Sequence, residues 1–283
     1  MEHLDSFAPL ASRFDGFIVD LWGVVHDGIN PYPGAVDCLA RLRQAGRRVV
    51  LLSNAPRRSW SAQVTLRRIG IPDDAYDGIL TSGEATRTAL IERTDPWFAG
   101  LGRRVWHLGP AKDHSIFEDV DLELVATPAE ADFVLNTGPD DEQGENAVEP
   151  YLPALRECAG LGLRMVCANP DLEVVRGGQR LVCAGLLARF YEQYGGEVRQ
   201  IGKPYAEIYG PVRAMLGLAD DRILAVGDAL ATDIAGAKAA GIASCWVLGG
   251  IHGEMIGNDH ALAEQEAAAA ALAPLVTVPS FSW

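Results

Sequence analysis

The sequence predicts a doubly wound α/β fold built on a parallel sheet, and two observations carry this prediction. Three apolar runs each end in a polar residue and a turn: FIVD ends at Asp20, VVLLSN reaches Ser53 and ILAVGD ends at Asp228. Continuous apolar runs of this length are typical of strands that are buried on both faces, as in a parallel sheet. Segments with helical periodicity separate the runs, and alternation of strands and helices is typical of this fold class.

The helices of this alternation are indicated by apolar spacing and by their end signals. The segment 34–48, after the first strand, has apolar residues at helical spacing and a stop at Gly46. The segment 232–242, after the third strand, is Ala-rich, opens with a threonine and an aspartate and closes at Gly241. Residues 246–248 then predict one further strand.

The middle of the chain repeats the alternation with material of its own. An insertion of roughly 100 residues with its own strands and helices is large enough to form a separate domain. We therefore predict an inserted α/β domain over 97–199, and a main domain formed by 1–96 and 200–283. The predicted elements of the insertion are strands at 103–109, 131–138 and 163–169 and a helix at 151–160.

Composition and charge exclude several classes of function. The 283 residues are 48% hydrophobic and 22% charged, as in a globular protein with ample core. The formal charge of −14 argues against nucleic acid or an anionic membrane as a partner, because both select a positive surface. We expect a cytoplasmic protein, because no apolar run is long enough to span a membrane and no signal peptide is apparent. The five scattered cysteines predict buried, reduced thiols.

Three polar residues at strand ends predict a site for phosphate chemistry. Ligands of such sheets bind at the carboxyl ends of the strands, where Asp20, Ser53 and Asp228 are expected. A carboxylate can attack phosphorus and form an aspartyl-phosphate, which divides one hard displacement into two. Magnesium prefers one or two carboxylates together with water and phosphate oxygens, and Asp20 and Asp228 can supply them.

Further residues complete this predicted site. Lys203 can pair with Asp20 and neutralise charge on the transferred phosphoryl group. Asp233 can hold a metal-bound water or orient the start of its helix, while Ser53 and the backbone amides near Asn54 bind phosphate oxygens. Each residue also fits a structural role: strand-end Asp and Ser often cap helices, lysine is usually solvated, and an acid favours a helix start. Their order and contexts together favour the functional interpretation.

A family resemblance becomes specific over five segments of the chain. In order, these are VDLWGVVHDGINPYPGAVDCLARLRQAGRRVVLLSNAPRRS, TSGEATRTAL, ANPD, IGKPYAEIYGP and AVGDALATDIAGAKAAGI. They resemble class IIA phosphatases of the haloacid dehalogenase superfamily, the group of NagD-like and pyridoxal-phosphate phosphatases. The resemblance implies a Rossmann-like core with a C2-type α/β cap inserted between the Ser53 and Lys203 segments. It also implies hydrolysis of a small phosphorylated metabolite with Mg²⁺ as cofactor.

The resemblance also assigns roles to individual positions. It places the family's nucleophile on Asp20, its phosphate-binding hydroxyl on Ser53, its lysine on Lys203 and its metal acid on Asp228, with Asp233 in support. Its substrate contacts fall on Asn54 and Arg57, and on Asn169 and Asp171 near the cap hinge. A solvated basic turn is the alternative for Arg57 and Arg58. Because caps of this family often pair, the resemblance further suggests a homodimer through the cap.

The sequence departs from the family pattern at Trp22. The family motif is Asp-x-Asp-Gly, and its second aspartate is the general acid and base, a function typically worth 10²–10⁴-fold in rate. The resemblance implies that the metal ligand at this position is the backbone carbonyl, which Trp22 still possesses, and the Trp22 side chain fits either packing or an aromatic wall against the substrate. His26 and Asp27 are candidate substitutes for the missing acid, and each also fits an ordinary turn.

Three hypotheses follow from this departure. The first is a Mg²⁺-dependent phosphatase with relocated acid–base chemistry or a preference for good leaving groups. The second is a binding or regulatory protein that keeps the phosphate pocket and turns over negligibly. The third is hydrolysis of a carbon–halogen bond, since relatives that attack carbon also lack the second aspartate. The pair Asp228 and Asp233 favours phosphate over the third hypothesis.

Overall fold

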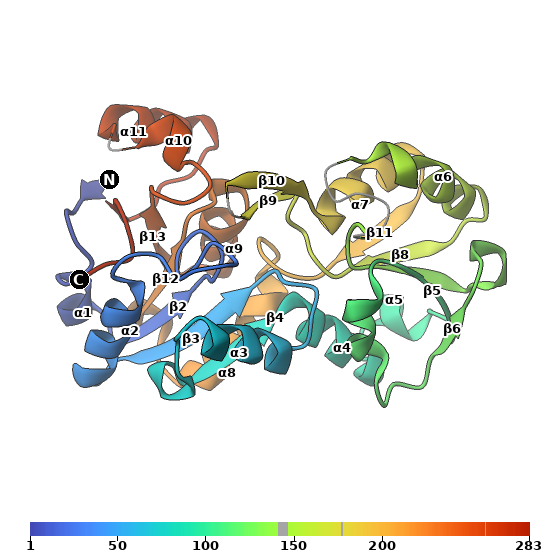
Figure 1. Cartoon of the computed structure of the whole chain (residues 1–283), viewed down its shortest axis with the longest axis horizontal. Helices are drawn as coiled ribbons and strands as arrows, with labels where there is room; N and C mark the ends of the chain where they lie inside the picture. The colour runs from blue at the N-terminus through green and yellow to red at the C-terminus, as the bar shows by residue number, and fades with distance from the viewer. Residues whose placement is uncertain (141–146, 177, 258) are drawn as a thin grey trace.

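The structure is a computed structural model, and it describes all residues except 141–146, 177 and 258. Two α/β parts lie side by side, each around its own parallel sheet (Figure 1). We call the part that holds both chain termini the core and the other part the cap. The two parallel sheets with helices on their faces confirm the predicted fold class.

The core sheet has seven parallel strands in the order β1-β14-β13-β12-β2-β3-β4. The three strands that the apolar runs predict, β12, β2 and β3, are neighbours at its centre, so their carboxyl ends lie next to one another. The strands are β1 (Glu2–His3), β2 (Gly16–Val19), β3 (Arg48–Ser53), β4 (Gly78–Thr81), β12 (Ile223–Gly227), β13 (Ala243–Val247) and β14 (Val276–Val278).

Helices cover both faces of the core sheet because its central strands are apolar on both sides. In β2, Phe17 and Val19 pack into one buried cluster and Ile18 packs into another on the opposite face. The first cluster includes residues of α1 (Leu10–Arg13), α2 (Ala35–Gln44) and α3 (Ser59–Arg68). The second includes residues of α8 (Tyr209–Leu216) and α9 (Ala235–Ala240). Two further helices, α10 (Gly253–Ile256) and α11 (His260–Ala269), pack beside β13.

The cap sheet has five parallel strands in the order β11-β8-β7-β5-β6. Helices α6 (Leu152–Gly160) and α7 (Ala184–Gln193) cover one face, and α5 (Pro96–Ala99) covers the other with the end of α4 (Ser82–Glu92). Because α4 begins directly after β4, it leads from the core sheet to the cap. The cap strands are β5 (Arg104–Leu108), β6 (Glu123–Val125), β7 (Phe133–Asn136), β8 (Arg164–Cys167) and β11 (Glu197–Gln200). The domain limits of 97 and 199 stay a prediction.

An antiparallel hairpin, β9 (Glu173–Arg176) and β10 (Gln179–Val182), lies between the two parts. Figure 1 shows it above the gap between the core and cap sheets, detached from both. The sequence carried a signal for this hairpin, since Gly177 and Gly178 separate two short runs rich in valine and leucine. The prediction of the cap did not include it.

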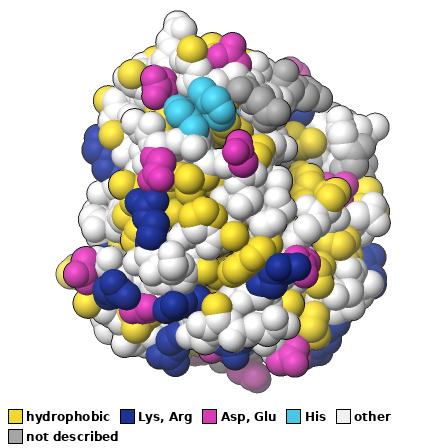
Figure 2. Space-filling view, turned by 90° about the vertical axis from the view of Figure 1, so that its left-hand side faces the viewer, with side chains coloured by type: hydrophobic (Ala, Val, Ile, Leu, Met, Phe, Trp, Pro, Cys, Tyr) yellow, Lys and Arg dark blue, Asp and Glu magenta, His cyan; other side chains and the backbone are white. Residues whose placement is uncertain are grey.

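The end of the core that faces away from the cap shows apolar side chains surrounded by charged ones, with histidines lying together (Figure 2). At the core edge, the ring of His3 in β1 lies 4.2 Å from that of His260 in α11, measured between centroids. His3 Nε2 also lies 3.2 Å from Glu264 Oε1. These contacts attach the edge strand β1 to α11. Among the described helices, none has the length and apolar character needed to cross a bilayer.

Candidate active site

The polar residues at the ends of β12, β2 and β3 form the floor of the site. Ser53 is the last residue of β3, and Asp20 and Asp228 directly follow β2 and β12. The Asp20 amide donates a hydrogen bond to the carbonyl of Val226, at 2.9 Å, so the sheet ladder itself places this carboxylate. All three side chains are buried. The structure therefore brings together residues that are widely separated in the sequence, since Asp228 lies more than 170 positions after both Asp20 and Ser53.

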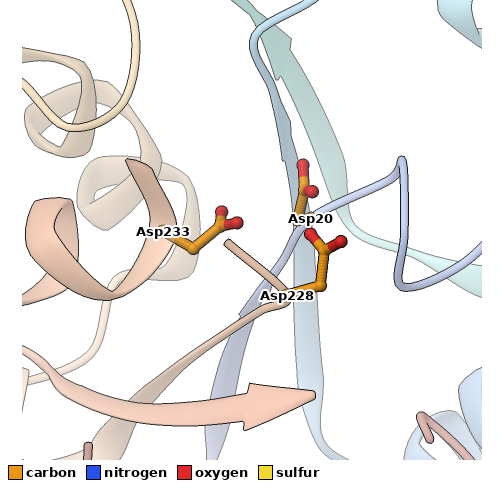
Figure 3. Close-up of side chains that lie close together, drawn as sticks. All are labelled: Asp20, Asp228 and Asp233. Carbon is orange, nitrogen blue, oxygen red and sulfur yellow. The ribbon is translucent and has the colours of Figure 1, made fainter. Parts of the chain in front are cut away.

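Two carboxylates of this floor meet a third one, that of Asp233. Asp20, Asp228 and Asp233 each offer an oxygen, and these atoms lie within 4.8 Å of one another (Figure 3). Asp228 Oδ2 accepts a hydrogen bond from the Ile251 amide at 2.6 Å. Asp233 Oδ2 accepts one from the Ala229 amide at 3.1 Å. The backbone thus fixes two of the three acids before any ligand binds.

The helix that carries Asp233 begins earlier than the sequence predicts. A π-helical turn, η7 (Leu230–Ile234), precedes α9, whereas we expected the helix to open at Thr232 and Asp233. The Asp233 carboxylate, which lies inside this turn, accepts the amide of Ala229, the residue before the turn, and this bond has the direction of the reciprocal bond in a capping box. Asp233 therefore combines the structural role and the site role that the sequence left open.

Lys203 provides the positive charge of the cluster. Its Nζ donates hydrogen bonds to Asp20 Oδ1 at 2.5 Å, to Asp233 Oδ1 at 2.7 Å and to the Leu52 carbonyl at 3.3 Å. Lys203 is only 4% exposed, so it is not a solvated surface lysine. Burial works to lower the pKa of Lys203, but the carboxylates of Asp20, Asp233 and Asp171 outweigh burial and raise it. The ammonium is therefore charged throughout the physiological range.

Three carboxylates surround this one ammonium, and the pKa values of two of them are raised. Burial raises the pKa of Asp20 well above its ordinary value, against the attraction of Lys203 and with the repulsion of Asp233 and Asp228. Burial and the charge of Asp233 raise the pKa of Asp228 to about 7. Negative charge in this cluster is thus left uncompensated by the protein. A hard cation with oxygen ligands, such as Mg²⁺, fits such a donor set.

The loop after Asp20 is shaped for this cluster. Gly23 has φ of +80°, and a Cβ there would lie 1.9 Å from Asp228 Oδ2, so glycine is required for the carboxylate to approach the loop. The carbonyl of Trp22 accepts no hydrogen bond from the described residues, and Trp22 lines the same cavity as the three acids. That carbonyl is available to a cation, as the resemblance implies.

The Trp22 side chain packs against the turn that follows it. A Cβ on Gly28 would lie 2.1 Å from the indole ring, and the ring of His26 meets the indole edge-on at 5.3 Å. His26 Nδ1 accepts the Gly28 amide at 2.9 Å, and burial lowers the pKa of His26 to about 4. Trp22 therefore packs on the turn and forms part of a cavity wall, and its role as an aromatic wall against the substrate stays a prediction.

Asp27, a candidate substitute for the missing acid, turns away from the cluster. Its Oδ1 accepts hydrogen bonds from the amides of Ile29 at 2.8 Å and Asn30 at 2.7 Å. These bonds, chiefly that from Asn30, lower its pKa. Asp27 does not line either of the cavities described below. The structure therefore separates Asp27 from the other candidate residues.

Asn54 joins the core loop to the return segment from the cap. Its Nδ2 donates to Asp171 Oδ1 at 2.8 Å and to the Lys203 carbonyl at 3.0 Å. Its Oδ1 accepts the Lys203 amide at 2.8 Å and Ser82 Oγ at 3.2 Å. Asn169 Oδ1 in turn accepts the Asp171 amide at 3.0 Å. Because its side chain is fully engaged, Asn54 positions Lys203 and Asp171, and leaves its backbone for a substrate.

Two adjoining cavities extend from this cluster. The carboxylate cavity, about 80 Å³, is lined by Asp20, Lys203, Asp228 and Asp233 together with residues of the hairpin. The cap cavity, about 230 Å³, is lined mainly by the loop after β3, by α3, by the hairpin and by cap residues. Four residues line both cavities: Trp22, Ser53, Asp171 and Val174.

Arg57 lines the cap cavity and joins the core to the cap. Its Nε lies 3.2 Å from Oδ1 of Asp113, a residue of the 3₁₀ turn η2 (Ala111–Phe117) in the cap. Asp113 is 2% exposed, whereas the Arg57 side chain is 42% exposed. Arg58 instead pairs with Glu84 at 2.7 Å within the core. No sequence pattern predicts Asp113 as a site residue, because it lies in a turn of the cap.

Comparison with known families places the chain among hydrolases. The family model for haloacid dehalogenase-like hydrolases matches residues 17–123, and a second, HAD-hydrolase-like model matches 200–276. The first match includes Asp20 and Ser53 and extends into the cap as far as the start of β6, and the second begins at the end of β11 and includes Lys203 and Asp228. They agree with the order of the segments that carry the resemblance.

Individual relatives extend this similarity over nearly the whole chain. A haloacid dehalogenase-like hydrolase structure from Brucella suis is 32% identical, with a TM-score of 0.84 over 98% of this chain and 99% of that chain. The sugar-phosphatase AraL of Bacillus subtilis is 26% identical and covers 83% of each chain. A 4-nitrophenylphosphatase of Schizosaccharomyces pombe is 25% identical and covers 88% of each. These matches confirm the predicted family resemblance.

Proposed function

The chain belongs to the haloacid dehalogenase-like hydrolases, and we propose that it is a Mg²⁺-dependent phosphatase of a small phosphorylated metabolite. The observation that carries this proposal is the convergence of Asp20, Lys203 and the two acids Asp228 and Asp233 at neighbouring strand ends. The relatives named as a sugar phosphatase and a 4-nitrophenylphosphatase support a phosphate ester as substrate.

The proposed nucleophile is Asp20. Its Oδ1 is held by Lys203, and the second oxygen is left to attack phosphorus and form an aspartyl-phosphate. The Ser53 hydroxyl, which lines the carboxylate cavity, would bind a phosphoryl oxygen, and the positive charge of Lys203 would offset negative charge as it redistributes. Water then displaces Asp20 and releases inorganic phosphate.

The proposed cation site consists of Asp20, Asp228 and the Trp22 carbonyl, with Asp233 in support. When bound, Mg²⁺ would supply positive charge that offsets repulsion between the phosphate dianion and the carboxylates. The raised pKa values of Asp20 and Asp228 support this assignment, because they mark negative charge that the protein alone does not neutralise. Lys203 holds Asp20 and Asp233 in place for the incoming cation.

The first test is a panel of aryl and alkyl phosphate esters, assayed with and without Mg²⁺. We expect Mg²⁺-dependent release of phosphate, and we expect Asp20→Asn to remove it, by at least about 10³-fold, because the amide is not a nucleophile. Turnover that survives in Asp20→Asn would exclude Asp20 from the mechanism. Binding of phosphate and Mg²⁺ without turnover of any ester would instead identify a binding or regulatory protein.

A further inference from the structure

The two cavities meet at the point where the substrate bond would break. If phosphate binds beside Asp20, the phosphoryl group occupies the carboxylate cavity and the leaving group occupies the larger cap cavity. The oxygen that joins the two must then lie near the residues that line both cavities: Trp22, Ser53, Asp171 and Val174. Of these four, Asp171 alone bears a carboxyl group.

We propose that Asp171 is the general acid and base of the reaction, in place of the aspartate that Trp22 replaces. This inference rests on the proposed phosphatase function. Asp171 comes from the segment between β8 and the hairpin, far in sequence from the Asp20 loop. The acid would thus approach the leaving group from the cap side of the site.

The contacts of Asp171 leave one carboxyl oxygen for this chemistry. Oδ1 accepts a hydrogen bond from Asn54 Nδ2, and the Asp171 amide donates to Asn169 Oδ1. Asn54 is itself fixed by two hydrogen bonds to the backbone of Lys203. Among the described residues, Oδ2 has no hydrogen-bond partner. The carboxyl group is therefore oriented by the core, with a free oxygen to carry the proton.

The pKa of Asp171 allows this residue to act as an acid in one step and as a base in the next. Burial raises its pKa to about 6, although Lys203 and the Asn54 hydrogen bond act to lower it, and Asp233 adds a further increase. The other ionisable groups that interact with Asp171 are Asp228 and the buried thiols of Cys167 and Cys183. A pKa near the working pH is the condition under which one group serves both steps.

Other carboxyl and imidazole groups are placed less well for this role. Asp27 lies outside both cavities, and its oxygen is taken by two backbone amides. His26 lines only the cap cavity, and its Nδ1 is engaged by Gly28. Glu173 lines only the carboxylate cavity and pairs with Arg180. Asp113 lines only the cap cavity and pairs with Arg57.

The proposed steps balance in protons and bonds. As Asp20 attacks phosphorus, the bond from phosphorus to the leaving oxygen breaks, and protonated Asp171 gives its proton to that oxygen, releasing an alcohol. Water then attacks the aspartyl-phosphate and gives a proton to the Asp171 carboxylate. The bond between phosphorus and Asp20 breaks, which frees phosphate and restores both acids.

The decisive variant is Asp171→Asn, because the amide oxygen still accepts the hydrogen bond from Asn54 Nδ2 but cannot transfer the proton. With an alkyl phosphate we expect turnover to fall by about 10²–10⁴-fold. With p-nitrophenyl phosphate, whose leaving group needs no proton, we expect a burst of about one equivalent of nitrophenol followed by slow steady turnover. Phosphorylated Asp20 should accumulate in that burst.

Rescue and a surface control complete the test. Trp22→Asp in the Asp171→Asn background returns a carboxyl group to the same junction, and we expect it to restore alkyl turnover. Asp37→Asn, at an exposed position of α2 that pairs with Arg41, should match the wild type. Loss of aryl and alkyl turnover together, without a burst and without rescue, would show a positioning role only and overturn the inference. Wild-type kinetics in Asp171→Asn would overturn it too, whereas an inactive wild type would contradict the phosphatase proposal itself.

Discussion

The carboxylate cavity is lined by side chains at the ends of neighbouring core strands together with Lys203 and hairpin residues, whereas the cap cavity is lined mainly by a core loop, a helix, the hairpin and cap turns. In the first, the parallel ladder fixes Asp20 against the β12 backbone and leaves few alternative positions. In the second, contacts between segments, such as Asn54 with Asp171 and Arg57 with Asp113, set the geometry. We infer that the core sheet positions the residues for phosphate chemistry. The loops and the hairpin that line the cap cavity select the leaving group, and their sequences can change without changing the sheet.

The comparison predicts the largest effects for changes in the carboxylate cavity. Lys203→Met should remove the ammonium that contacts both Asp20 and Asp233. Breaking a buried ion pair from one side typically costs about 3–5 kcal/mol of folding free energy, because the remaining charge is left unpaired. Loss of this charge should also slow phosphoryl transfer by at least about 10²-fold. Denaturant unfolding and steady-state kinetics measure the two effects.

Lys238→Met is the matched control for this change. Lys238 occupies an exposed position of α9, and its ammonium donates to the carbonyl of Ala271, so its removal should leave stability and turnover near the wild-type values. Equal losses of stability in the two variants would contradict the assignment of Lys203 as the charge that holds the cluster together.

A smaller effect should link metal binding to pH. The pKa of Asp228 in the folded protein, about 7, lies above its value in an unfolded chain, about 3.9, so the folded state retains a proton that the unfolded state has lost. Without metal, this carboxyl therefore lowers stability as pH rises from about 4 to about 7, by up to roughly 4 kcal/mol. Bound Mg²⁺ should remove the repulsion, so the rise in Tm on adding Mg²⁺ should be larger at about pH 8 than at about pH 5.

The difference in Tm with and without Mg²⁺ separates the contribution of the carboxylates to the pH dependence of stability from that of other titrating groups. The buried His26, with its pKa lowered to about 4, contributes the opposite trend, because it lowers stability as pH falls below about 6.5. Its contribution is the same with and without Mg²⁺, so it cancels in the difference. Asp228→Asn should reduce the Mg²⁺ effect at both pH values. A rise in Tm that is equal at both pH values in the wild type would contradict the cation site.

The same contrast explains how much of the molecule the sequence predicts. Strand ends at Asp20, Ser53 and Asp228 are visible as apolar runs that stop at a polar residue, and parallel pairing then brings them together. The carboxylate cavity therefore follows from local patterns and sheet topology. The order of the strands and the burial of Lys203 cannot be predicted from local patterns, because both depend on the whole fold.

The cap cavity depends on contacts that have no local pattern. Asp171 was expected near the cap hinge, but its junction position depends on a hydrogen bond to Asn54, which lies 117 positions away. Asp27 has the sequence context of a site residue, yet its carboxylate satisfies the amides of its own turn. The choice between these acids rests on where the folded chain places each carboxyl group relative to the two cavities, and spacing along the chain does not encode that position.

The smallest expected effect concerns the link between core and cap. Arg57→Ala should leave Asp113 buried without its arginine partner and loosen the wall of the cap cavity. Because the Arg57 side chain is 42% exposed, solvent screens the pair, and we expect a loss of about 1 kcal/mol, or roughly fivefold in kcat/KM. The loss should appear as a higher KM while kcat changes little, since Arg57 does not line the cavity that holds Asp20, Asp228 and Asp233. Arg58→Ala removes a pair within the core, with Glu84, and should leave KM unchanged. Parallel increases of KM in both variants would mean that the loop as a whole, and not its contact with the cap, shapes the leaving-group side of the site.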